Sequence, residues 1–154
     1  MKTFATLSHP AQSTDVRVEQ RLFETGADAE AHTQSADGTY RRLWPTSTAF
    51  AQYLCTHPAL IRGKRVIEIG SGSGAIGLVC AALGAAHVCI TDSAVHLIAD
   101  NVAHNPQLSG MVSVLPLAWG KRSHIEACLQ VGGHFDVVVA CEVVYKVSLR
   151  VESP

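Results

Sequence analysis

A glycine-rich stretch, VIEIGSGSGAIG, matches two cofactor-binding patterns at once. Gly72, Gly74 and Gly77 have the dinucleotide spacing G-x-G-x-x-G. A second pattern, acidic-x-G-x-G-x-G, begins at Glu68 and takes its first glycine at Gly70. Glycines after a strand allow positive φ and let a ligand approach the backbone, and a helix behind them directs its first N–H groups at that ligand. The stretch therefore predicts a cofactor site, with a tight strand-to-helix turn as the structural alternative.

An acidic residue, Asp92, follows Gly72 by twenty residues and ends the next predicted strand. An acid at this place hydrogen-bonds ribose hydroxyls in dinucleotide-binding folds. Its alternative role is to cap the following helix, which Ser93 could do equally well. A ribose acid does not separate NAD from S-adenosylmethionine, because both contain adenosine.

Glu68 lies inside an otherwise apolar strand, VIEI. Burying a carboxylate without a partner is costly, so this residue predicts a loop amide or a ligand ammonium beside it. A pyrophosphate would be repelled, whereas the ammonium and sulfonium of S-adenosylmethionine would be attracted. The charge of Glu68 therefore favours S-adenosylmethionine over NAD.

The elements that position these residues alternate between strand and helix. Helices are predicted over 74–83, 93–104 and 121–130, and strands over 64–69, 87–91, 111–117 and 135–141. This order predicts an α/β fold with a parallel sheet and helices on both faces, as in doubly wound nucleotide-binding domains. The last strand, with VVVA at its centre, reads as a central strand buried on both faces.

The N-terminal part of the chain is less regular. Residues 1–38 are predicted to form a loose arm with possible short strands, one of them over 16–20, and residues 39–154 to form the domain. A helix is predicted from the Trp44–Pro45 pair to Cys55, capped by a hydroxyl of the TST sequence that follows the proline.

Composition limits the classes of function. The chain has 154 residues, a net charge of -1 and 47% hydrophobic residues, which predicts one soluble domain without a nucleic-acid footprint. No apolar run is long enough to span a membrane, and no signal peptide is expected. The 5 cysteines include no C-x-x-C and the 8 histidines have no ligand spacing, so we expect no metal site and a cytoplasmic, possibly also nuclear, location.

Further motifs carry a resemblance to a known family. RLWP contains Trp44, ITDSAVHLIADNVAHN contains Asp92, LAWG contains Trp119, and FDVVVACEVVY ends in Glu142-x-x-Tyr145. Together with the glycine loop, this ordered set resembles the class I, seven-strand S-adenosylmethionine-dependent methyltransferases, and more narrowly methyltransferase family 16. That group consists of protein lysine methyltransferases, so the resemblance implies a protein substrate with a lysine acceptor.

The resemblance also implies roles for individual residues. Trp119 would lie by the adenine and Asp92 would hold the ribose, while Glu142 and Tyr145 would lie beside the transfer site. The remaining cofactor contacts would come from Trp44, Glu68, Gly70, Ser71, Gly72 and Cys141. Cys141 and Glu142 depart from the small residue and the aspartate that are more usual there. Without the family, a lone tryptophan more often packs in a core, and Glu142 and Tyr145 could be a helix charge and a packing aromatic.

The family's fold continues with further strands, whereas this sequence ends nine residues after Tyr145. The sequence therefore predicts a Rossmann-like sheet that is incomplete at its C-terminus. A truncated, non-catalytic relative that binds cofactor or protein is the alternative to an enzyme, and an NAD-dependent oxidoreductase is a third possibility.

Overall fold

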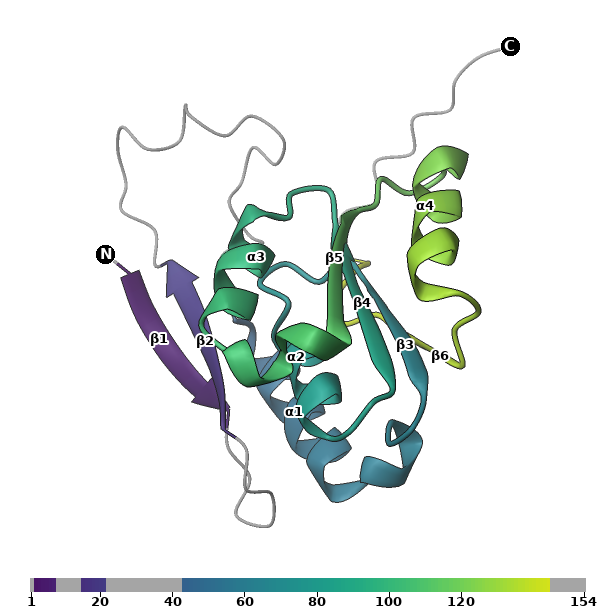
Figure 1. Ribbon diagram of the computed structural model, residues 1–154. Helices are drawn as coiled ribbons and strands as arrows, with labels where there is room; N and C mark the ends of the chain where they lie inside the picture. The colour runs from purple at the N-terminus through teal and green to yellow at the C-terminus, as the bar shows by residue number, and fades with distance from the viewer. Residues whose placement is uncertain (1, 8–14, 22–42, 145–154) are drawn as a thin grey trace, which may run out of the picture.

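The computed structural model describes residues 2–7, 15–21 and 43–144, which form two sheets and the helices around them (Figure 1). The main sheet contains β3 (Arg65–Ile69), β4 (His87–Asp92), β5 (Val112–Pro116) and β6 (Val137–Val139), in the order β5-β4-β3-β6 with every pair parallel. A separate antiparallel pair joins β1 (Lys2–Leu7) to β2 (Val16–Arg21). The predicted α/β class with a parallel sheet is confirmed.

Helices cover the two faces of the main sheet unequally. Figure 1 shows α1 (Pro45–Thr56), α2 (Ala75–Ala82) and α3 (His96–Ala103) on one side and α4 (Arg122–Gly132) on the other. Short 3-10 turns, η3 (Pro58–Leu60) and η4 (Pro106–Met111), follow α1 and α3. Helices on both faces of a parallel sheet make a Rossmann-like domain. Among the described helices, none combines the length and the apolar character that crossing a bilayer requires.

The side chains of each strand alternate between two apolar clusters. Val66 and Ile90 point into the larger cluster, which α1, α2 and α3 complete and which includes Val16 of β2. Ile67 and Cys89 point into the smaller cluster beneath α4. Because burying apolar surface drives folding, the strand β2 is part of the domain core.

The register of the sheet brings three strand ends to one edge. Glu68 is level with Ile90 of β4 and with Val139 of β6. The loops after β3, β4 and β6 therefore emerge side by side, where ligands bind in open parallel sheets.

Most predicted elements agree with the structure to within a few residues, but three details are wrong. Lys2–Leu7 is a strand, because it pairs with β2, and not a loose arm. Neither α1 nor α3 has a side-chain cap, since Trp44 and Val95 occupy the N-cap positions. Ser93 instead donates its hydroxyl to Asp92 Oδ1 at 3.2 Å. The loop predicted between residues 24 and 38 lies outside the described residues.

The prediction that the last strand is central is also wrong. Within the described residues, β6 pairs only with β3 and forms an edge of the sheet. Val138 is 63% exposed, because α4 packs over β4 and β5 on that face. An apolar run alone did not reveal this, since burial depends on which elements lie beside the strand.

The contact between α2 and the sheet requires glycine at position 77. A Cβ there would lie 2.6 Å from Ile90 Cγ1 and 2.7 Å from Glu68 Oε2. We expect Gly77→Ala to lower the free energy of unfolding by about 1–2 kcal/mol, because overpacking outweighs the gain in helix propensity. Urea unfolding measures this. Gly110→Ala is the control, since a Cβ at Gly110 meets nothing within 4 Å; equal stability of the two variants would contradict the prediction.

Candidate functional site

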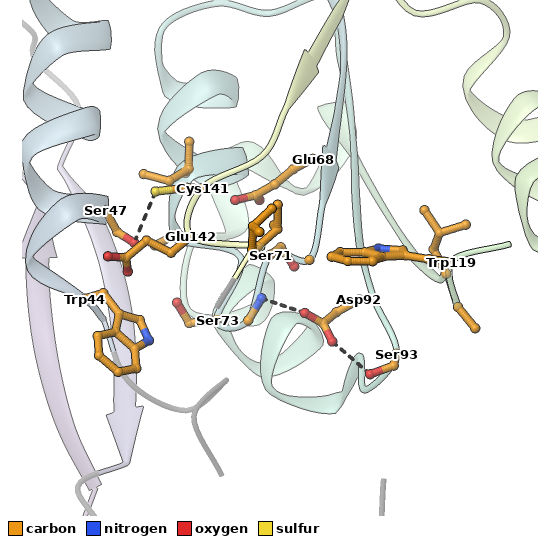
Figure 2. Close-up of a pocket in the computed structure, with 18 residues that line it drawn as sticks. Trp44, Ser47, Glu68, Ser71, Ser73, Asp92, Ser93, Trp119, Cys141 and Glu142 are labelled. Carbon is orange, nitrogen blue, oxygen red and sulfur yellow. Dashed lines mark hydrogen bonds between the residues drawn. The ribbon is translucent and has the colours of Figure 1, made fainter. Parts of the chain in front are cut away.

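A pocket of about 600 Å³ opens at the carboxyl ends of β3, β4 and β6 (Figure 2). It contains all the predicted site residues that the structure describes: Trp44, Glu68, Gly70, Ser71, Gly72, Asp92, Trp119, Cys141 and Glu142. Tyr145 lies outside the described residues. The structure thus brings together side chains from positions 44 to 142, although their contact with a cofactor stays a prediction.

The glycine loop forms the floor of this pocket. Gly70, Gly72 and Gly74 have φ values of 64°, 59° and 76°, in the left-handed region that favours glycine. The N–H of Ser71 donates to Thr91 O at 3.0 Å, and the N–H of Gly74 donates to Ser71 O at 3.0 Å. The loop is therefore held to β4 by a hydrogen bond of its own backbone.

Gly70 also lets two walls of the pocket approach. A Cβ at this position would lie 2.8 Å from Val143 Cγ1 and 3.3 Å from Trp119 Cζ2. The positive φ and the close approach both require glycine here. The sequence pattern predicted the first requirement but not the second.

Asp92 supports the loop with its carboxylate. Oδ2 accepts the N–H of Gly72 at 2.8 Å, while Oδ1 accepts the hydroxyl of Ser93 and, at 3.3 Å, the N–H of Ala94. These bonds lie before α3, so Asp92 does not cap that helix. The same side chain lines the pocket, which leaves it beside any ligand that rests on the loop.

Glu68 is the buried acid of the site, with an exposed fraction of 2%. Its Oε2 accepts the N–H of Gly77, in the first turn of α2, at 2.9 Å. Burial raises the pKa of Glu68 to about 8, the Gly77 N–H opposes the rise, and the carboxylate of Asp92 adds to it. The predicted loop amide partner is therefore present as a helix amide.

Glu142 follows β6 in a strained conformation. Its φ is 56°. Among the described residues, Glu142 is the one residue other than glycine with a positive φ. Such a conformation costs on the order of 1 kcal/mol and persists where surrounding structure imposes it. Next to it, the Cys141 Sγ lies 3.8 Å from the Ser47 Oγ of α1, and burial raises the pKa of the Cys141 thiol.

Two tryptophans stand on opposite sides of the pocket in Figure 2. Trp44 is 37% exposed and Trp119 is 59% exposed, so neither is a core residue. Both rings line the pocket, where an exposed aromatic face can contact a ligand.

Sequence reasoning missed the other half of the lining: Ser47, Ser73, Ala75, Ile76, Ser93, Leu117, Ala118, Val143 and Val144. Six of these nine residues lie next to a predicted site residue or a strand end, and Ala75 and Ile76 begin α2 directly after the glycine loop, so position in the predicted fold was a usable signal for eight of them. Ser47 had none, because only the packing of α1 brings it there.

The charge of the pocket has one sign. Glu68, Asp92 and Glu142 are acidic, and no lysine, arginine or histidine lines it among the described residues. The same part of the chain contains no cluster of three or more side chains that could hold a metal ion. The pocket therefore suits a ligand that carries positive charge.

The sequence profile of one family, described as lysine methyltransferase, matches residues 25–151. The chain belongs to the lysine methyltransferase family. The predicted family is therefore confirmed. S-adenosylmethionine is the methyl donor of this family, as the resemblance implied.

Curated lysine methyltransferases are similar to this chain over part of their length. Mouse EEF1A lysine methyltransferase 3 is 36% identical over 110 residues, which are 70% of this chain and 45% of the mouse protein. Protein N-lysine methyltransferase METTL21A of Danio rerio is 35% identical over 67% of this chain and 47% of its own. Calmodulin-lysine N-methyltransferase of Arabidopsis thaliana is 36% identical over 64% and 33%. The chain thus spans less than half the length of these relatives.

The pocket fits the methyl donor of the lysine methyltransferase family. The hydroxyl oxygen of Ser71 is buried without a hydrogen-bond partner in the described structure, so it is free to bond a ligand there. Asp92 offers a carboxylate for ribose hydroxyls, Trp119 a ring face for adenine, and Glu68 a buried acid whose charged form an adjacent ammonium would stabilise. These residues would hold the donor.

The raised pKa of Glu68 gives a pH dependence of stability. The unfolded chain releases this proton near the ordinary value of 4.5, whereas the folded chain keeps it to about 8. The free energy of unfolding contributed by Glu68 therefore falls as pH rises between these values. We expect the free energy of unfolding of Glu68→Gln to lack this decrease. Between pH 5 and pH 8 the natural chain should therefore lose a few kcal/mol of stability more than the variant does, at about 1.4 kcal/mol for each pKa unit.

Urea unfolding at several pH values measures the difference between the two proteins. Glu126→Gln is the control, because the Glu126 side chain is 59% exposed and pairs with Arg122 on the surface. If the free energies of unfolding of Glu68→Gln and the natural chain changed with pH in parallel, the raised pKa of Glu68 would be contradicted.

Proposed function

We propose that this chain binds S-adenosylmethionine and takes part in methyl transfer to a lysine side chain of a protein. The observation that carries the proposal is the pocket at the strand ends, which has three acidic side chains and no basic side chain among its described lining residues. Both the donor, with its sulfonium and ammonium, and the acceptor, a lysine, bring positive charge to such a pocket.

The same observation opposes a dinucleotide. The pyrophosphate of NAD would lie on the glycine loop, close to Glu68 and Asp92, with no lysine or arginine lining the site to offset its charge. The N–H of Gly72, in the loop, and the N–H of Gly77, in α2, already donate to Asp92 and Glu68, which removes them as phosphate donors. Glycine spacing allows both cofactors, but the charges favour the sulfonium.

S-adenosylmethionine supplies a methyl group on positively charged sulfur when it is bound. The chain's own residues would hold the donor: Asp92 would accept hydrogen bonds from ribose, Trp119 would cover the adenine, and Glu68 would pair with the ammonium. Methyl transfer would then depend on how these residues place the acceptor nitrogen in line with the bond between the methyl carbon and the sulfur.

Glu142 is the residue we assign to the acceptor side. A lysine amine must be neutral to attack, and its ordinary pKa is about 10.4. The carboxylate of Glu142, exposed at the pocket after β6, would accept a hydrogen bond from the amine and orient it. Tyr145 completes the acidic-x-x-aromatic motif in the sequence, and its role beside the acceptor stays part of this proposal.

The names of relatives supply first candidates for the substrate. EEF1A and calmodulin occur in the names of two lysine methyltransferases similar to this chain, so these two proteins are the first to test. A cytoplasmic or nuclear location is also part of this proposal.

Calorimetric titration tests the cofactor. We expect S-adenosylhomocysteine to bind and NAD not to bind, and the reverse result would overturn the proposal. Asp92→Ala should weaken binding about tenfold or more, because it removes both the ribose acceptor and the support of Gly72. Asp92→Asn keeps an oxygen that accepts from Gly72, so its smaller loss separates the two effects.

A second prediction concerns transfer. Glu142→Gln should lower methyl incorporation from radiolabelled donor into EEF1A or calmodulin more than it lowers affinity for S-adenosylhomocysteine, because the side chain acts on the acceptor and not on the donor. Glu126→Gln, on the exposed surface of α4, is the matched control. Equal losses in transfer and affinity would remove Glu142 from the acceptor side.

A further inference from the structure

Two buried asparagines make hydrogen bonds that the proposed chemistry does not use. Asn101 lies in α3, and Asn105 lies two residues after the helix ends. Asn101 is 0% exposed and Asn105 is 1% exposed. Asn101 Nδ2 donates to Ser73 O at 2.9 Å, which links the helix to the glycine loop. Asn105 Oδ1 accepts the N–H of Arg17 at 2.9 Å, and its Nδ2 donates to Arg17 O at 2.6 Å, which links the same region to β2.

The two amides thus serve different parts of the fold. Asn105 Nδ2 also donates to Asn101 O at 2.8 Å, so the residues are neighbours in one buried polar network. Among these hydrogen bonds, the one from Asn101 to Ser73 joins this network to the glycine loop. Asn101 makes it from α3, a helix that contributes no residue to the pocket lining.

Ser73 occupies a sensitive place in the loop. It lies between Gly72 and Gly74, both with positive φ, and it is 4% exposed and lines the pocket. A buried carbonyl that loses its donor retains the full cost of desolvation, so the loop would shift to recover a hydrogen bond. Because the loop backbone itself forms the floor of the pocket, such a shift changes the surface on which a ligand rests.

We propose that Asn101 is a positioning residue that holds the cofactor loop in its binding shape, whereas Asn105 anchors β2. The inference rests on the proposed function for the identity of the ligand, but the contact between Asn101 and Ser73 is independent of it. Asn101 touches neither donor nor acceptor, and acts only through the loop.

Matched variants separate the two roles. Asn101→Leu and Asn105→Leu each remove one buried amide of similar size from the same region. Hydrogen exchange measured by NMR without ligand reports on the loop amides of Gly72 and Gly74 and on the amide of Arg17. Calorimetry with S-adenosylhomocysteine reports on affinity.

We expect Asn101→Leu to speed exchange at Gly72 and Gly74 and to weaken S-adenosylhomocysteine binding about tenfold, the size expected when one buried carbonyl loses its donor. Asn105→Leu should speed exchange at Arg17, lower the melting temperature, and leave affinity within about twofold. Unchanged loop exchange in Asn101→Leu would overturn the proposal. Equal loss of affinity in Asn105→Leu would also overturn it, because the effect would then be a general loss of stability.

Two further results keep the inference separate from the proposed function and from folding. If the natural chain does not bind S-adenosylhomocysteine but loop exchange still depends on Asn101, the proposed function fails and the positioning role stands. If Asn101→Leu does not fold, the side-chain amide protons of Asn101 in the natural chain decide. Slow exchange supports the bond to Ser73, and rapid exchange overturns it.

Discussion

The hydrogen bond from the Gly77 N–H to the carboxylate of Glu68 fixes how α2 meets β3, and the pocket depends on it. The helix must lie so close to the sheet that a Cβ at position 77 would touch both Glu68 and Ile90. The chain can turn from strand to helix in so little space only through residues with positive φ, which Gly70, Gly72 and Gly74 supply. A single close contact thus explains most of the glycine pattern.

The same contact buries the acidic side chain of Glu68 at a position where an apolar side chain would be more stable. An apolar side chain at position 68 would avoid the desolvation that raises the pKa of Glu68, and it would avoid the nearby charge of Asp92. A residue that costs stability in the free chain, yet lines a pocket, is expected where function requires it. A cationic ligand would offset this cost, so binding and stability are linked through Glu68.

Local features could be predicted from the sequence, and long-range ones could not. The position of Asp92 and the need for a partner at Glu68 follow from strand ends and from the cost of a buried charge. The exposure of Val138 does not, because it depends on the neighbours of β6. Ser47 and Asn101 were missed for the same reason: their contacts join residues 94 and 28 positions apart.

The two sides of the pocket are held in different ways. On the donor side, the loop is fixed by the amides of Ser71 and Gly72, by the carbonyl of Ser73 and by the bond to Glu68. On the acceptor side, Glu142 follows an edge strand in a strained conformation, beside a sulfur–hydroxyl contact of 3.8 Å.

This asymmetry has a thermodynamic consequence. Because hydrogen bonds within the chain already order the loop, little of the donor's binding energy would be spent on shaping it. The strain at Glu142 has no comparable support from buried hydrogen bonds among the described residues. Under the proposed function, donor affinity and acceptor placement would therefore depend on separate parts of the fold, so that a substitution on one side need not affect the other.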